Sequence, residues 1–142
     1  MSLLTPGDPI HGWITEHGRA WGPRVVRAYD EEHTVKSACF SNALLLMRRD
    51  LDLSYCEGYA QYGGVPLPIH HAWCVTQAGG VVDPTWADGD GYFGVWFGRE
   101  YATRRHDRMR SAGSVGSLIN PSTSDRNFRL LRRRVSRATW ER

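Results

Sequence analysis

The chain has 142 residues, 41% hydrophobic and 23% charged, with a formal net charge of +3. This predicts one folded domain over residues 1–142 and excludes a disordered or collagen-like chain. No apolar run approaches the roughly 20 residues of a membrane span, and residues 1–8 lack the basic and apolar regions of a secretory signal. We therefore expect a cytoplasmic protein.

The first half of the chain is predicted to mix helices and strands. Apolar residues within 9–21 indicate a glycine-interrupted helix, and residues 25–29 a short strand or a loop. The clearest helix covers residues 36–49, where apolar residues recur at three- and four-residue steps. Strands are expected over residues 53–62, 71–77 and 81–82, the last two joined by a tight turn.

The second half is predicted to be looser and more basic. We expect a loop over 86–91, an edge strand or extended segment over 92–97, a helix over 100–110, a mobile glycine- and serine-rich stretch over 111–120, and a basic helix over 124–142.

Charge divides the chain into two unequal parts. Residues 1–98 carry six Lys/Arg and 11 Asp/Glu, a net of −5, whereas residues 99–142 carry 12 Arg and four acidic residues, a net of +8. The basic part either docks on the acidic part or contacts a protein or nucleic acid through Arg132, Arg133 and Arg134.

Three cysteines, Cys39, Cys56 and Cys74, are an odd number whose spacings match no zinc signature. We expect free thiols and no metal, and nothing in the sequence indicates a cofactor. Asp88 and Asp90 lie in a glycine-rich stretch without the other ligands of a calcium loop, so an ordinary turn is expected there.

One of these cysteines stands in a pattern typical of nucleophilic catalysis. Cys39 falls near the start of the clearest helix, where the helix terminus favours a thiolate. His71 opens one predicted strand, and Asp83 follows the next strand across a tight hairpin. An imidazole beside the thiol would act as its base, and a carboxylate would fix the orientation of the imidazole.

Strand alternation separates these residues from their neighbours. His71 and Trp73 share one face of the predicted strand, while Cys74 points the other way. Cys74 and Cys56 are therefore interpreted as small core residues. His70 is expected to be exposed or to hydrogen-bond a loop.

At these residues the sequence resembles the transglutaminase-like superfamily, and over 92–97 it is similar to small uncharacterised members from actinobacteria and their phages. The resemblance covers about residues 34–101, leaving about 102–142 as a basic C-terminal extension. The matching segments are Cys39-Phe40-Ser41-Asn42-Ala43, Glu57-Gly58-Tyr59, His71-Ala72-Trp73, Val82-Asp83-Pro84-Thr85-Trp86 and Tyr92-Phe93-Gly94-Val95.

The predicted elements indicate an α+β fold, and the resemblance implies a papain-like core. A nucleophile helix would pack on an antiparallel sheet of three or four strands, between an N-terminal helical segment and a basic C-terminal helix. It implies Cys39 as nucleophile, His71 as general base and acid, and Asp83 as the orienting carboxylate. Activities in the superfamily include amide hydrolysis and acyl transfer to amines. The upstream glutamine pattern that supplies an oxyanion donor is absent, and Ser37-Ala38 stands in its place.

Three functional hypotheses follow. The first is a cysteine-dependent enzyme that hydrolyses or transfers the acyl group of a peptide, protein or small amide. The second is a catalytically inert binding module, phage-encoded and acting in the host cytoplasm. The third is acyl transfer between small molecules, as in the arylamine acetyltransferases, which are much longer chains. Candidate substrate-binding residues, each with packing or a buried hydrogen bond as the alternative, are Asn42, Glu57, Tyr59, Trp73, Trp86 and Tyr92.

Overall fold

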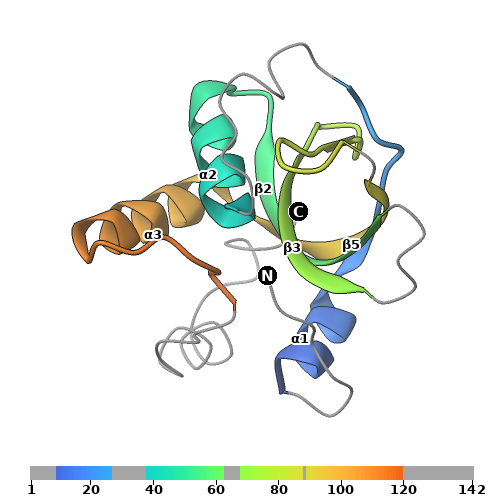
Figure 1. Cartoon of the computed structure of the whole chain (residues 1–142), viewed down its shortest axis with the longest axis horizontal. Coiled ribbons are helices and arrows are strands. Elements are labelled where there is room, and N and C mark those ends of the chain that lie inside the picture. The colour runs from blue at the N-terminus through green and yellow to red at the C-terminus, as the bar shows by residue number, and fades with distance from the viewer. Residues whose placement is uncertain (1–8, 27–37, 63–67, 88, 120–142) are drawn as a thin grey trace.

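The computed structural model describes residues 9–26, 38–62, 68–87 and 89–119, so the expected helix over 124–142 lies outside it. The described part is α+β, as expected, and three helices accompany one curled antiparallel sheet of five strands (Figure 1). In chain order the elements are α1 (Pro9–His17), β1 (Arg19–Trp21), α2 (Cys39–Arg49), β2 (Ser54–Tyr62), β3 (Ile69–Val75), β4 (Val81–Val82), β5 (Gly89–Phe97) and α3 (Arg99–Ser111).

The sheet has the strand order β1-β5-β2-β3-β4 and curls until its two edges meet. After β1 the chain runs beside β4, where the N–H of Val25 donates to the carbonyl of Val81 at 2.6 Å. The N–H of Val81 donates in turn to the carbonyl of Pro23 at 2.9 Å. This closure brings Arg24, which bridges Val81, to the end of the sheet where the chain leaves β4.

The sheet has one or two strands more than expected. β1 is an additional strand, because the expected helix over 9–21 ends at His17 and residues 19–21 pair with β5. β5 begins at Gly89, within the expected loop, and lies inside the sheet between β1 and β2, so the expectation of an edge strand is wrong. Glycine permits this pairing: a Cβ on Gly58 would lie 2.4 Å from the Cα of its partner Gly94.

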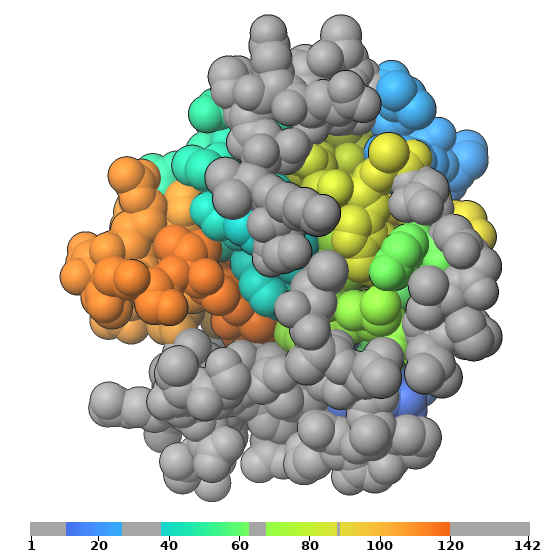
Figure 2. Space-filling view, in the orientation of Figure 1, coloured from blue at the N-terminus to red at the C-terminus, as the bar shows by residue number. Residues whose placement is uncertain are grey.

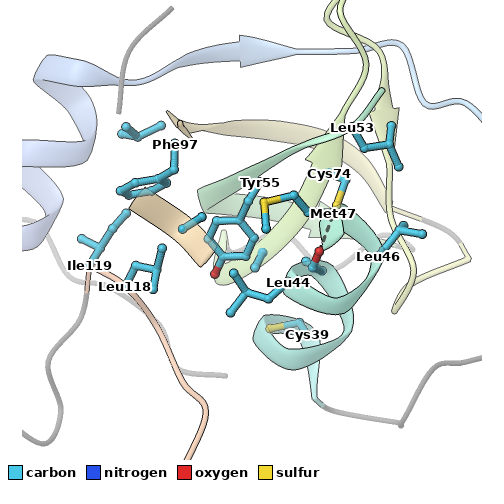
Figure 3. Close-up of a cluster of buried hydrophobic side chains, with 14 of the residues drawn as sticks. Cys39, Leu44, Leu46, Met47, Leu53, Tyr55, Cys74, Phe97, Leu118 and Ile119 are labelled. Carbon is cyan, nitrogen blue, oxygen red and sulfur yellow. Dashed lines mark hydrogen bonds between the residues drawn. The ribbon is translucent and has the colours of Figure 1, made fainter. Parts of the chain in front are cut away.

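α2 packs mainly against β3, on the face that carries Ala72 and Cys74. The thiol of Cys74 donates to the carbonyl of Ala43, in the second turn of α2, at 3.2 Å (Figure 3). The opposite face of β3 carries Trp73 and Val75, which join a second buried cluster with Cys56. The alternation predicted for β3 is therefore confirmed, and Cys56 and Cys74 are buried core residues.

The chain beyond β5 is tied back to the core. The guanidinium of Arg99, the first residue of α3, donates to the carbonyls of Met47, Asp50 and Leu53 at 2.5–2.9 Å. After α3, Leu118 and Ile119 are fully buried in the main hydrophobic cluster (Figure 3). The expectation that 111–120 is mobile is therefore wrong at these two residues, which have their own places in the core.

Candidate active site

His71 and Asp83 form a buried hydrogen-bonded pair. His71 lies on β3 and Asp83 directly follows β4, two strands that pair antiparallel. The Nε2 atom of His71 lies 2.9 Å from Oδ2 of Asp83, and both side chains are fully buried. At this distance the Nε2–H of His71 donates to the carboxylate, and this hydrogen bond fixes the orientation of the imidazole ring.

The carboxylate of Asp83 is surrounded by donors. Its Oδ1 accepts the backbone N–H groups of Thr85 and Trp86, at 2.9 and 3.0 Å. Its Oδ2 also accepts the hydroxyl of Tyr92 at 2.7 Å. Burial alone would raise the pKa of Asp83, but the hydrogen bonds and charge of His71, with those of Trp86 and Tyr92, hold it below its usual value. Asp83 is therefore ionised at neutral pH.

Cys39 is the first residue of α2, so the expected position in the first turn is confirmed. The backbone of Ala72, the residue after His71, lies close enough to the thiol to lower its pKa. β4 is only two residues long and pairs with Cys74 and Val75, so it does not extend alongside Ala72. The start of α2 thus meets β3 beyond the end of β4, on the face that carries Ala72. The side chain of His71 lies on the opposite face of β3, where its ring stacks on Trp73 and Trp86.

Burial dominates the electrostatics of Cys39, which has no exposed surface and lies at one end of the main cluster (Figure 3). Burial raises the pKa of its thiol to about 12, although the nearby backbone of Ala72 acts in the opposite direction. The carboxylates of Glu57 and Asp83 raise this pKa further. The helix terminus was expected to favour the thiolate, but in this structure desolvation outweighs it and the thiol is protonated.

Trp86 covers one face of the imidazole. Its ring stacks on His71 with centroids 3.7 Å apart and planes 12° apart, and it also contacts Tyr62. Trp86 is partly exposed, whereas Trp73, whose ring lies 6.3 Å from that of His71, is fully buried. Of these two tryptophans, Trp86 is the one with exposed surface.

Asn42 joins α2 to the loop that carries Asp83. The side-chain amide of Asn42 donates to the hydroxyl of Thr85 at 3.0 Å. The surfaces of α2 and of the loop after β4 lie side by side, cyan and yellow in Figure 2. This hydrogen bond is only partly buried, and it ties Asn42 to a neighbour within the chain.

Glu57 is the centre of a second buried cluster, formed with the end of the described chain. Its carboxylate accepts the hydroxyls of Tyr55 and Ser117 at 2.5 and 2.6 Å, and also the backbone N–H of Leu118. His70 is buried and lies 3.3 Å from the same carboxylate, so it is not exposed, although its contact with Ser117 is the expected contact with a loop.

The remaining two candidate substrate residues also have partners within the chain. The hydroxyl of Tyr59 hydrogen-bonds the ring of His11 in α1. The hydroxyl of Tyr92, besides donating to Asp83, accepts a hydrogen bond from Arg24 at 3.3 Å. Arg24 was not predicted, because it lies 59 residues before Asp83 and only the closure of the sheet brings the two together.

Within the described ranges, no cluster of three His, Cys, Asp or Glu side chains is arranged to hold a metal ion. None of the described helices is long and apolar enough to cross a membrane. Comparison with protein-family models, with curated proteins and with solved structures finds no match to this chain.

Proposed function

We propose that this protein is a cysteine-dependent acyl-transfer enzyme. Cys39 is the nucleophile, His71 the general base and acid, and Asp83 the orienting carboxylate. The proposal includes the papain-like core of the transglutaminase-like superfamily, which the order of these residues resembles. The observation that carries it is the buried His71–Asp83 hydrogen bond, formed one residue from the backbone that contacts the Cys39 thiol.

The chemistry follows from the two nitrogens of the imidazole. Nε2 of His71 is bonded to Asp83, so Nδ1 is the nitrogen left to accept the thiol proton once a rearrangement brings the Cys39 sulfur to it. The sulfur of Cys39 attacks the carbonyl carbon of an amide, a C–S bond forms, and the proton passes to Nδ1. When the C–N bond breaks, His71 returns that proton to the leaving amine. Water or a second amine then attacks the thioester and releases the thiol.

The resting site must change before it reacts. The sulfur of Cys39 is 0% exposed, so the atoms around it must move before a carbonyl carbon can reach it. Its raised pKa means that the thiol is neutral in this state. The proposed reaction therefore transfers the proton to His71 as the C–S bond forms, and does not start from a standing thiolate.

The proposal covers both hydrolysis and transfer to an amine, since both begin with the same thioester. It includes peptides, proteins and small amides as substrates, and the cytoplasm as location, the host cytoplasm if the protein is phage-encoded.

Acetylation by p-nitrophenyl acetate tests the proposal without knowledge of the natural substrate. Peptide mapping by mass spectrometry measures the rate at which each cysteine is acetylated in the folded protein. We expect Cys39 to be acetylated at least tenfold faster than Cys56 or Cys74. We expect His71→Gln to slow Cys39 by about 10²–10⁴, the usual contribution of general-base catalysis.

A matched control is His106→Gln, which changes another buried histidine, located in α3. It should leave acetylation of Cys39 at the wild-type rate. Circular dichroism confirms that each variant is folded. The proposal is refuted if the three cysteines react at equal rates, or if folded His71→Gln reacts as fast as the wild type.

One observation favours an inert binding module as the second candidate, namely the complete burial of the Cys39 sulfur. In that case Cys39→Ser would leave function intact. Charge reversal of Arg132, Arg133 and Arg134, which lie outside the described residues, would abolish binding to a protein or nucleic acid. Binding that weakens steeply as salt is raised would identify nucleic acid as the partner.

A further inference from the structure

The carboxylate of Asp83 hydrogen-bonds other groups besides His71. The hydroxyl of Tyr92 donates to the same Oδ2 atom that bonds His71. Nη1 of Arg24 donates to that hydroxyl at 3.3 Å, and Nη2 donates to the backbone carbonyl of Asp83, also at 3.3 Å. A chain of donors therefore runs from Arg24 through Tyr92 to the carboxylate.

Each member of this chain comes from a different part of the curled sheet. Tyr92 is in β5, and its aromatic ring packs edge-on against Trp73 of β3, with centroids 5.1 Å apart. Arg24 follows β1 and reaches Asp83 because the segment after β1 pairs with β4. The side chain of Arg24 is 16% exposed and its Nη1 lies 3.9 Å from the carboxylate.

We propose that Tyr92 and Arg24 are positioning residues that keep the carboxylate of Asp83 ionised and hydrogen-bonded to His71. This inference rests on the proposed function, because it assigns the two residues to the support of that site. Tyr92 thereby moves from a candidate wall of a substrate cleft to a support for the orienting carboxylate.

The chemistry of each group suits this role. Burial and the neighbouring Asp83 carboxylate raise the pKa of Tyr92 above its usual value, so its hydroxyl keeps its proton and must act as a donor. Arg24 supplies a fixed positive charge beside the buried carboxylate, and its planar fork contacts two groups at once. Among the described residues, His71 and Glu57 also act on Asp83 or on the thiol.

The test removes one hydroxyl and follows the carboxylate directly. In Tyr92→Phe, ¹³C NMR of the Asp83 carboxyl group should give a titration midpoint about one pH unit above the wild type, because a hydrogen bond to a charged acceptor is lost. Exchange of the Nε2 proton of His71 with solvent should become about tenfold faster. Tyr101→Phe, which also removes a hydroxyl from a mostly buried ring, should change neither quantity.

Arg24 is tested with two variants and a matched control, so that a folding defect in one variant does not decide the result. Arg24→Gln should also raise the Asp83 midpoint, and Arg24→Lys should restore it in part because lysine retains the charge without the fork. Arg19→Gln is the matched control, since the guanidinium of Arg19 lies over the ring of Trp21.

The NMR result and the acetylation result separate the two proposals. If Tyr92→Phe and Arg24→Gln are folded and titrate at Asp83 as the wild type does, the positioning roles are refuted, whatever Cys39 does. If Cys39 fails to react in the wild type while both variants raise the midpoint, the acyl-transfer proposal fails and the support of Asp83 by Tyr92 and Arg24 stands.

Discussion

The amide of Asn42 donates to the hydroxyl of Thr85 at 3.0 Å and links α2 to the loop after β4. Asn42 is 4% exposed and lies one helical turn after Cys39. Thr85 in turn donates its backbone N–H to the carboxylate of Asp83. The relative position of the thiol and the carboxylate therefore depends on a side-chain hydrogen bond between two elements that are not adjacent in sequence.

The first prediction concerns this link. Asn42→Ala should lower the free energy of unfolding by about 1–3 kcal/mol, because it leaves a partly buried hydroxyl without its donor. Urea unfolding measures the loss. Gln77→Ala, at an exposed position after β3, is the control and should cost less than about 0.5 kcal/mol. If Asn42→Ala is as stable as the control variant, the hydrogen bond contributes nothing to the free energy of unfolding.

A second prediction concerns the carboxylate of Glu57. Glu57→Gln keeps the shape but replaces one acceptor oxygen with a donor, which then faces the hydroxyl of Tyr55 at one oxygen position or that of Ser117 at the other. We expect a loss of about 3 kcal/mol in urea unfolding, and faster hydrogen exchange at the backbone of Leu118. Glu100→Gln changes a side chain that is 88% exposed and should have little effect. Unchanged exchange at Leu118 in Glu57→Gln would contradict this view of the cluster.

A third prediction concerns Arg99, which caps the end of α2. Its guanidinium satisfies carbonyls at the end of α2 and just after it that have no partner within the helix. Arg99→Ala should therefore lower the free energy of unfolding by about 2–4 kcal/mol. This loss should appear as a clearly lower midpoint temperature of thermal unfolding. Arg104→Ala, in the same helix and 66% exposed, is the control. Equal midpoints for the two variants would rule out a capping role.

A fourth prediction concerns alkaline pH. Burial raises the pKa of Cys39 from 9.0 to about 12, and the pKa values of Cys74 and Tyr55 are raised as well. Well below pH 9 these groups are protonated in both the folded and unfolded states, so they add no pH dependence there. Above pH 9 the unfolded chain loses protons that the folded protein keeps, and stability must fall as pH rises.

Urea unfolding under reducing conditions at pH 8, 9, 10 and 10.5 measures this fall. Cys39 alone should contribute up to about 1.4 kcal/mol per pH unit across this range. Cys39→Ala should therefore reduce the slope by that amount, whatever its effect at pH 8. A wild-type stability that stays constant to pH 10.5 would contradict the burial of these groups.

Much of the fold could be predicted because its elements carry local signals. The helical spacing over α2, the alternation along β3 and the glycine turn before β4 each lie within a short stretch of sequence. Gly18 shows the limit: a Cβ there would lie 3.0 Å from the carbonyl oxygen of Gly94, a contact across 76 residues, so the end of α1 depends on packing. The alternation of β5 could not be recognised in the sequence, because its glycines carry no side chain that would show which face they lie on.

Some features of the candidate site could likewise be predicted from the sequence, and others could not. The pairing of His71 with Asp83 could be predicted, because a hairpin brings their two strands together. The contributions of Arg24 and Tyr92 could not, since they require the sheet to curl and close. The burial of Cys39 also escaped prediction, because the helix position of a residue says nothing about how many atoms surround it.

The closure of the sheet has a consequence for the behaviour of the protein at high concentration. An unpaired strand edge is a template for intermolecular pairing and aggregation. Here the chain itself occupies the edge of β4, through the hydrogen bonds between Val81 and residues 23 and 25. β4 therefore offers no edge for a second molecule to extend, and self-association by strand addition at that edge would first require residues 22–25 to detach.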